Sequence, residues 1–156
     1  MSFRRVDLVV VAAALALGSA VTAVTGAQAV EPAQGPIRFR PVHVYVDPAG
    51  APLAAYQLEI VVDGNAMIVG VEGGEHPAFA RPPHYDPAAL TGGRIILAAF
   101  DTGTELPTQR TRVATVHMRE TGSVEPSYHA TLQIAGGPDG RPIEATVELE
   151  PDEGDR

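Results

Sequence analysis

The sequence predicts an all-β fold, a β-sandwich or jelly roll of seven or more short strands. Two observations carry this prediction. After residue 30, apolar and polar residues alternate with period two over several short runs, as in strands with one buried face. Turn-forming residues separate the runs, because the 156 residues include 16 Gly and 14 Pro. No run in this part of the chain has helical spacing over as much as about three turns.

The N-terminal segment has the pattern of an export signal. Two Arg near the start precede an uncharged, mostly apolar run over residues 8–29. The tripeptide Ala27-Gln28-Ala29 fits the small-x-small cleavage rule, so we predict a signal peptide over residues 1–29 and a mature chain from Val30. The alternative is an uncleaved anchor, since the run is long enough to cross a bilayer. Either reading places the rest of the chain outside the cytoplasm, secreted or in the periplasm or cell envelope.

The first predicted strand follows a polar linker over residues 30–36. In residues 37–47 the apolar side chains occupy odd positions before Pro41 and even positions after it. A proline cannot donate a hydrogen bond to a strand ladder, and strands tolerate it at an edge or a bulge. We therefore predict one long strand that breaks at Pro41 and contributes to two sheets.

The next predicted elements are two strands, residues 53–63 and 66–72, joined by the tight turn Asp63-Gly64-Asn65. Asp-Gly is a strong hairpin signal. Residues 75–93 contain four Pro, which exclude long elements. Within them, Asp86 is a good N-cap and Pro87 suits the first helical position, so one helical turn is predicted.

Four further strands complete the prediction. Residues 94–101 are apolar on both faces, as in a central strand that is covered on both sides. Residues 111–120 direct Ala114, Val116 and Met118 inward. Residues 127–135 place Tyr128, Ala130, Leu132 and Ile134 on one face, and residues 143–149 form the last strand. Residues 151–156 are a charged tail.

Composition excludes several classes of function. All 11 basic residues are Arg against 19 acidic residues, and the net charge of −8 argues against a nucleic-acid partner. The absence of Cys excludes disulfides, zinc–thiolate sites and a cysteine nucleophile. No G-x-S-x-G motif is present, and no set of nucleophile, base and orienting residue is visible, so we predict that the protein is not an enzyme.

Five segments resemble the cohesin-like, carbohydrate-binding-module-like β-sandwich domains. They are residues 42–47 (VHVYVD), 53–60 (LAAYQLEI), 68–73 (IVGVEG), 94–100 (RIILAAF) and 112–118 (RVATVHM). The resemblance covers residues 37–150, and residues 50–58 (GAPLAAYQL) match the family's second strand best. It implies a jelly-roll β-sandwich of about nine strands and non-catalytic protein binding. In cohesins the ligand is a calcium-loaded dockerin, held mainly by one sheet face.

The family's binding face, together with the strand alternation, suggests a partner-binding surface. The candidate residues are Glu72, Arg94, Thr115, His117 and Arg119. The long loop over residues 72–93 is a second candidate, and its alternative role is a proline-stiffened cover over one end of the sandwich.

Two other functions stay open. An envelope carbohydrate-binding module would display Tyr45 and Tyr85, because sugar sites rely on exposed aromatic rings. A membrane-anchored structural subunit would follow if the N-terminal segment is not cleaved.

We predict no metal site and no cofactor. The five His, at positions 43, 76, 84, 117 and 129, are scattered along the chain, whereas a metal site needs converging ligands. Calcium is the alternative, with oxygen ligands from the acidic turn residues Asp47, Asp63, Asp86, Asp101 and Asp139.

Overall fold

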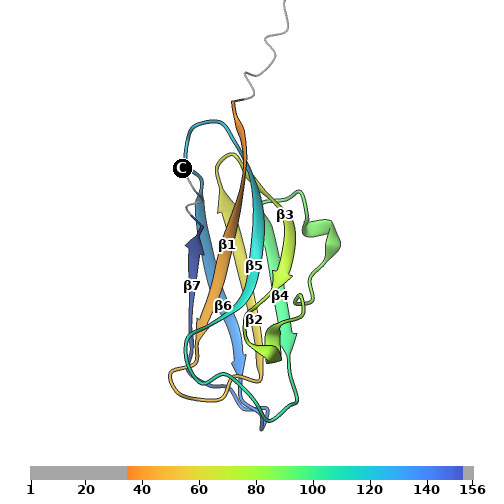
Figure 1. The fold of residues 1–156 in the computed structure, drawn as a ribbon, viewed down its shortest axis with the longest axis vertical. Helices are drawn as coiled ribbons and strands as arrows, with labels where there is room; N and C mark the ends of the chain where they lie inside the picture. Colours follow the sequence, from red (N-terminus) through yellow and green to blue (C-terminus); the bar gives the residue numbers. More distant parts are fainter. Residues whose placement is uncertain (1–34, 153–156) are drawn as a thin grey trace, which may run out of the picture. The chain divides into compact units, whose positions relative to one another are not determined.

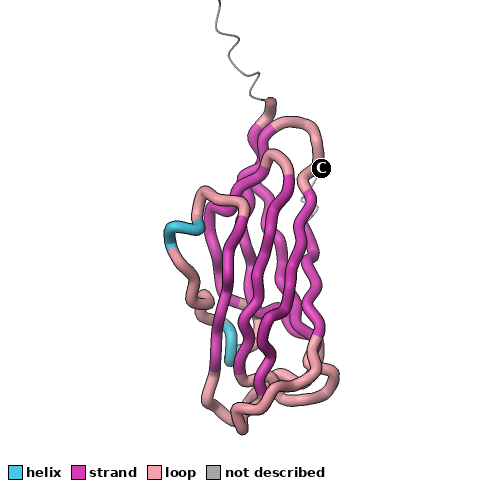
Figure 2. Tube along the Cα trace, turned by 180° about the vertical axis from the view of Figure 1, so that it is seen from behind, coloured by secondary structure: helices cyan, strands magenta, loops and turns pink. Residues whose placement is uncertain are grey.

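The computed structural model describes residues 35–152, which form two antiparallel sheets. The predicted signal peptide lies outside the described residues. The strands are β1 (Ile37–Asp47), β2 (Ala55–Asp63), β3 (Ala66–Gly73), β4 (Arg94–Phe100), β5 (Thr111–Thr121), β6 (Ser127–Gly136) and β7 (Thr146–Pro151). One sheet has the strand order β3-β5-β1-β7 and the other β4-β2-β6 (Figures 1 and 2). The predicted all-β sandwich is confirmed.

The described residues hold seven strands, rather than the nine that the family resemblance implied. Between β3 and β4 the chain forms only two short 3-10 turns, η1 (Pro77–Phe79) and η2 (Pro87–Ala89). Prolines in this segment remove backbone donors and prevent a continuous ladder. Neither short helix is long enough to span a membrane, and no other helix is found over residues 35–152.

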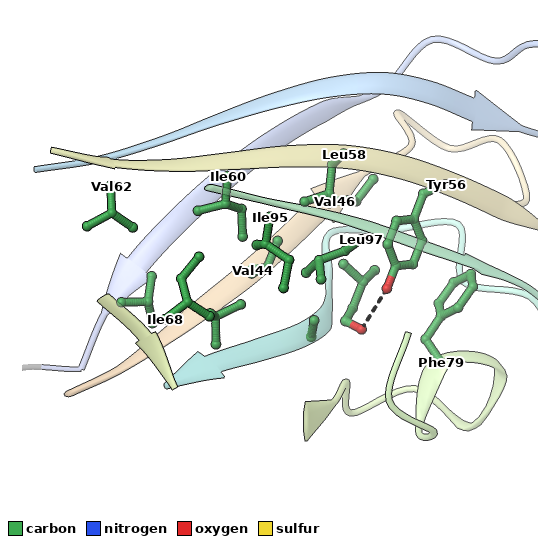
Figure 3. Packing of buried hydrophobic residues seen from close by; sticks show 14 of the residues in the cluster. Val44, Val46, Tyr56, Leu58, Ile60, Val62, Ile68, Phe79, Ile95 and Leu97 are labelled. Carbon is green, nitrogen blue, oxygen red and sulfur yellow. Dashed lines mark hydrogen bonds between the residues drawn. The ribbon is translucent and has the colours of Figure 1, made fainter. Parts of the chain in front are cut away.

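The core lies between the two sheets (Figure 3). Val44 and Val46 of β1 face Leu58 and Ile60 of β2, and all four side chains are buried. β4 and β5 add further buried aliphatic side chains at alternate positions. The inward positions therefore follow the period-two patterns of the sequence.

The prediction that β1 divides at Pro41 between two sheets is wrong. β1 pairs with β5 continuously from Ile37 to Val46, in one sheet. Its even-numbered side chains face the same side throughout, so the backbone does not change phase. The chemistry of the inward positions changes instead, because Arg38 and Arg40 occupy them before Pro41 and valines occupy them afterwards.

The turn at Asp63-Gly64-Asn65 forms, with Gly64 at a φ of 100°, but it does not close a hairpin. β2 pairs with β4 and β6, whereas β3 pairs with β5 in the other sheet. The buried faces of β2 and β3 meet the same core from opposite sides. The turn therefore carries the chain from one sheet to the other.

β4 lies at the edge of its sheet, not at the centre as predicted. His84 covers part of this edge, because its backbone exchanges two hydrogen bonds with Ala98, at 2.8 and 3.0 Å. In β6, a bulge between Leu132 and Ile134 turns Ile134 to the outer face, where it is exposed, and Ala135 is buried instead. This bulge overturns the predicted inward position of Ile134.

The last strand begins at Thr146, later than the predicted Ile143. The backbone N–H of Ile143 donates instead to the carbonyl oxygen of Ala135, at 3.0 Å. This hydrogen bond ties the segment before β7 to the end of β6.

The loop between β3 and β4 is fastened to the sandwich by Phe79. This ring is buried and meets the Tyr56 ring edge-to-face, with centroids 5.2 Å apart (Figure 3). The predicted helical turn is confirmed as η2, because the Asp86 carboxylate accepts the N–H of Ala88 at 2.9 Å. At the start of the loop, Gly74 packs against the Arg112 carbonyl so closely that no side chain fits. These contacts give the loop a structural role as a cover.

Candidate functional site

The outer face of the four-stranded sheet brings four of the five predicted partner-binding residues onto neighbouring strands. Glu72 lies on β3 opposite Thr115 of β5. His117 and Arg119 follow at alternate positions along β5, so all four belong to the same sheet face.

The fifth residue, Arg94, belongs to a different surface. It lies on β4, in the three-stranded sheet, and forms a salt bridge with Glu59 of β2. The sequence pattern showed that Arg94 points outward, but could not show from which sheet. The predicted surface therefore separates into a group of four and a single residue.

Three of the grouped side chains reach solvent and one does not. His117 Nε2 lies 3.1 Å from Glu72 Oε1. Arg119 is half-buried and directs Nη1 toward the Met67 sulfur, at 3.8 Å. Thr115 is only 4% exposed, so it supports the face from below instead of meeting a partner.

Thr115 is held by a polar contact with His43 of β1. The Thr115 Oγ1 and His43 Nδ1 atoms are 3.1 Å apart, and Arg112 Nη1 lies 3.4 Å from the same nitrogen. A guanidinium can only donate, so Nδ1 is the acceptor in the Arg112 contact, whereas the hydroxyl of Thr115 can donate or accept. This contact explains why an outward-pointing threonine is buried.

The two predicted sugar-binding tyrosines do not form a free platform. The guanidinium of Arg110 lies 3.7 Å above the centroid of the Tyr45 ring and covers one of its faces. Arg110 is held there by Glu148 at 3.0 Å and Glu150 at 2.5 Å, both on β7. Tyr85 is half-buried and packs against the core.

A cluster of charges inside one end of the sandwich was missed by the sequence reasoning. The side chain of Glu120 is 1% exposed and lies 3.1 Å from Arg40 Nε and 3.3 Å from Arg38 Nη2. The Tyr128 hydroxyl donates to Glu120 Oε1 at 2.5 Å. Glu125, in the β5–β6 connection, pairs with both arginines from the solvent side.

The sequence held one signal for this cluster. Glu120 has the same parity as the buried Ala114, Val116 and Met118, so the strand pattern places it inward. Burial, and then the hydrogen bond to Glu120, raises the pKa of Tyr128, so this tyrosine stays protonated and can donate.

The acidic turn residues stabilise the turns in which they lie. Asp47, Asp86, Asp101 and Asp139 each accept the backbone N–H two residues later, at 2.6–3.1 Å. Asp63 lies 3.6 Å from the His129 ring instead. Over residues 35–152 no three His, Asp or Glu side chains gather as a metal site would require.

Comparison of the chain with family models, with characterised proteins and with solved structures gives no match.

Proposed function

We propose that the protein is an exported, non-catalytic, cohesin-like module that binds another protein through the outer face of the four-stranded sheet. The observation that carries this proposal is the grouping of Glu72, His117 and Arg119 on the neighbouring strands β3 and β5. The family resemblance names a dockerin-type protein as the partner.

The chemistry of the surrounding face supports protein binding. Arg119 lies between Met67 of β3 and Phe39 of β1, and Phe39 is 72% exposed. Arginine, methionine and aromatic residues are the types enriched in protein interfaces. His117 and Glu72 add a polar pair beside this apolar row.

Protein binding is favoured over sugar binding because of the state of Tyr45. A sugar ring stacks on an open aromatic face, and Arg110 already occupies one face of Tyr45.

The test compares two variants that make the same charge change on opposite sheets. The full chain, immobilised, is used to capture partners from the native envelope and secreted fractions, with and without EDTA. We expect Arg119→Glu to abolish capture of the partner without lowering the melting temperature. Arg94→Glu is the matched control, because Arg94 lies on the other sheet, and we expect it to leave capture unchanged.

Each result has a definite meaning. Unchanged capture by Arg119→Glu refutes the assignment of this face. Equal loss in both variants points to net charge rather than to a defined surface. A partner that is released by EDTA supports a calcium-dependent, dockerin-type protein, and one that EDTA does not release removes the dockerin analogy while keeping the module's binding role.

A further inference from the structure

Within residues 35–152, the first residues of β1 have no neighbouring strand on the β7 side, and we propose that an extended segment of another protein adds there as an extra strand. β5 pairs with β1 from Ile37 onward, but β7 pairs with it only from Val42, opposite Pro151. Figure 1 shows β1 continuing past the end of β7. Within the described part of the chain, no strand lies on the β7 side of residues 37–40.

Two backbone hydrogen bonds show which groups face this open side. The Gly122 N–H, in the β5–β6 connection, donates to the Pro36 carbonyl at 3.0 Å, so the carbonyl group of Pro36 points toward β5. The Asp152 N–H donates to the Pro41 carbonyl at 2.8 Å, so the carbonyl group of Pro41 points toward the β7 side. The backbone groups of a strand alternate in direction. The N–H and C=O groups of both Ile37 and Phe39 therefore point to the open side.

These groups form a template for strand addition. An unpaired row of backbone donors and acceptors binds an extended peptide through main-chain hydrogen bonds. Proteins usually protect such an edge with lysine, with proline or with a bulge. Here Pro41 is at the end of the row nearest to β7, and the residues before it in the chain, 37–40, are Ile, Arg, Phe and Arg.

The outer side of the edge is apolar. Phe39 is 72% exposed and Ile37 is 46% exposed, on the same face. An added strand would place alternate side chains directly beside these two. Apolar residues at those positions would cover both side chains, so the incoming segment should be apolar at every second residue.

The inner side of the edge carries the guanidinium groups of Arg38 and Arg40. Glu120 holds them from within, and Glu125 holds them from outside at 3.1–3.5 Å. Glu125 is 60% exposed, and ion pairs of exposed side chains are weak. A carboxylate on the incoming strand can therefore replace Glu125, in a charge-assisted hydrogen bond with the same arginines.

Together the two sides define the ligand as an extended segment in which apolar and acidic residues alternate. This edge adjoins the Glu72, His117 and Arg119 surface and shares the exposed Phe39 side chain with it, but the proposal does not depend on the function proposed above. The two can fail independently, because the peptide test follows the backbone groups of Ile37 and Phe39, whereas Arg119→Glu changes a side chain of β5.

The test uses the full chain and two synthetic peptides, one alternating valine with glutamate and one alternating valine with lysine. Binding is followed by fluorescence anisotropy, and the amide signals of Ile37 and Phe39 are followed by NMR. We expect the glutamate peptide to bind with a Kd below about 1 mM, more tightly than the lysine peptide. The two amides should shift and gain protection from hydrogen exchange.

Two substitutions at one position separate backbone from side-chain contributions. Phe39→Pro removes an N–H that faces the open edge and leaves the ladder with β5 intact, so it should weaken binding about tenfold. Phe39→Val keeps the N–H and introduces a smaller, β-branched apolar side chain, so it should weaken binding less than about threefold. Circular dichroism of both variants checks that the sandwich is folded.

Five results would overturn the proposal. They are no binding of the glutamate peptide at about 1 mM, equal binding by Phe39→Pro and the unchanged chain, and a preference for the lysine peptide. The fourth is that a chain ending at Asp152 binds about tenfold more tightly than the full chain, which would assign the edge to residues 153–156. Concentration-dependent dimerisation that Phe39→Pro abolishes would assign the edge to a second copy and also contradict the proposal.

Discussion

Replacing Glu120 by glutamine tests whether the charge cluster holds one end of the sandwich together. The substitution keeps the size of the side chain and removes its charge. The new amide keeps one oxygen for the Tyr128 hydroxyl, but its NH₂ group can only donate, and both neighbouring arginines are also donors. The two guanidinium groups then share only the charge of Glu125.

The expected loss follows from burial. Breaking a buried ion pair by removing one partner costs about 3–5 kcal/mol. Arg38 and Arg40 are partly exposed, at 41% and 22%, so water and Glu125 compensate part of the loss. We therefore expect Glu120→Gln to lower the free energy of unfolding by about 3 kcal/mol. Domains of this size are stable by about 5–15 kcal/mol, so the variant still folds.

Urea unfolding followed by circular dichroism measures this loss. With an m-value of about 2 kcal/mol/M, the midpoint should fall by about 1.5 M. Glu125→Gln is the matched control, because Glu125 contacts the same two arginines but is exposed. We expect this control to change stability by less than about 1 kcal/mol.

A loss in unfolding free energy below about 0.5 kcal/mol in Glu120→Gln would refute this role of Glu120, because substitutions at ordinary surface positions cause losses of that size. A double-mutant cycle with Arg40→Met identifies the partner. The coupling energy should exceed about 1 kcal/mol if the Arg40–Glu120 pair carries the effect.

Three further outcomes follow from the packing. Phe79→Ala should cost about 3–5 kcal/mol and make the β3–β4 loop sensitive to protease, whereas intact resistance would contradict its role as an anchor. Gly74→Ala should cost more than about 2 kcal/mol, because an added Cβ overlaps the Arg112 carbonyl, while Gly136→Ala, with no atom closer than 3.7 Å, should be nearly neutral in urea unfolding. Burial raises the pKa of Tyr56, so above pH ~10 only the unfolded state loses this proton, and Tyr56 should lower stability by about 1.4 kcal/mol per pH unit in addition to the fall that Tyr128 causes. Denaturant titrations between pH 9 and 11 measure this slope, and an equal slope in Tyr56→Phe would rule out the explanation.

Local rules were enough to predict most of the side chains that face the core, although not Ile134 and Ala135 beside the bulge in β6. The alternation in β5 placed Ala114, Val116 and Met118 inward, as the structure has them. The turn at Asp86 was also predictable, because an N-cap and a proline at the first helical position act within a few residues.

Pairing between strands was not predictable in the same way. The Asp63-Gly64-Asn65 turn carried a hairpin signal, but its two strands joined different sheets. β4 had the composition of a central strand, yet it lies at an edge that His84 partly covers. Residues distant in sequence decide these outcomes, and a local pattern holds no information about them.

The same distinction between local pattern and strand pairing applies to the candidate site. The amino-acid pattern was sufficient to show that Glu72, His117 and Arg119 point away from the core, because strand parity is a property of consecutive residues. The pairing of the strands was needed to show that these three share a face, while Arg94 lies on the other sheet. The same pairing shows that the arginines before Pro41 meet Glu120, and that β7 pairs with β1 only from Val42 onward. Register and sheet order set these neighbours, and both depend on how the whole core packs.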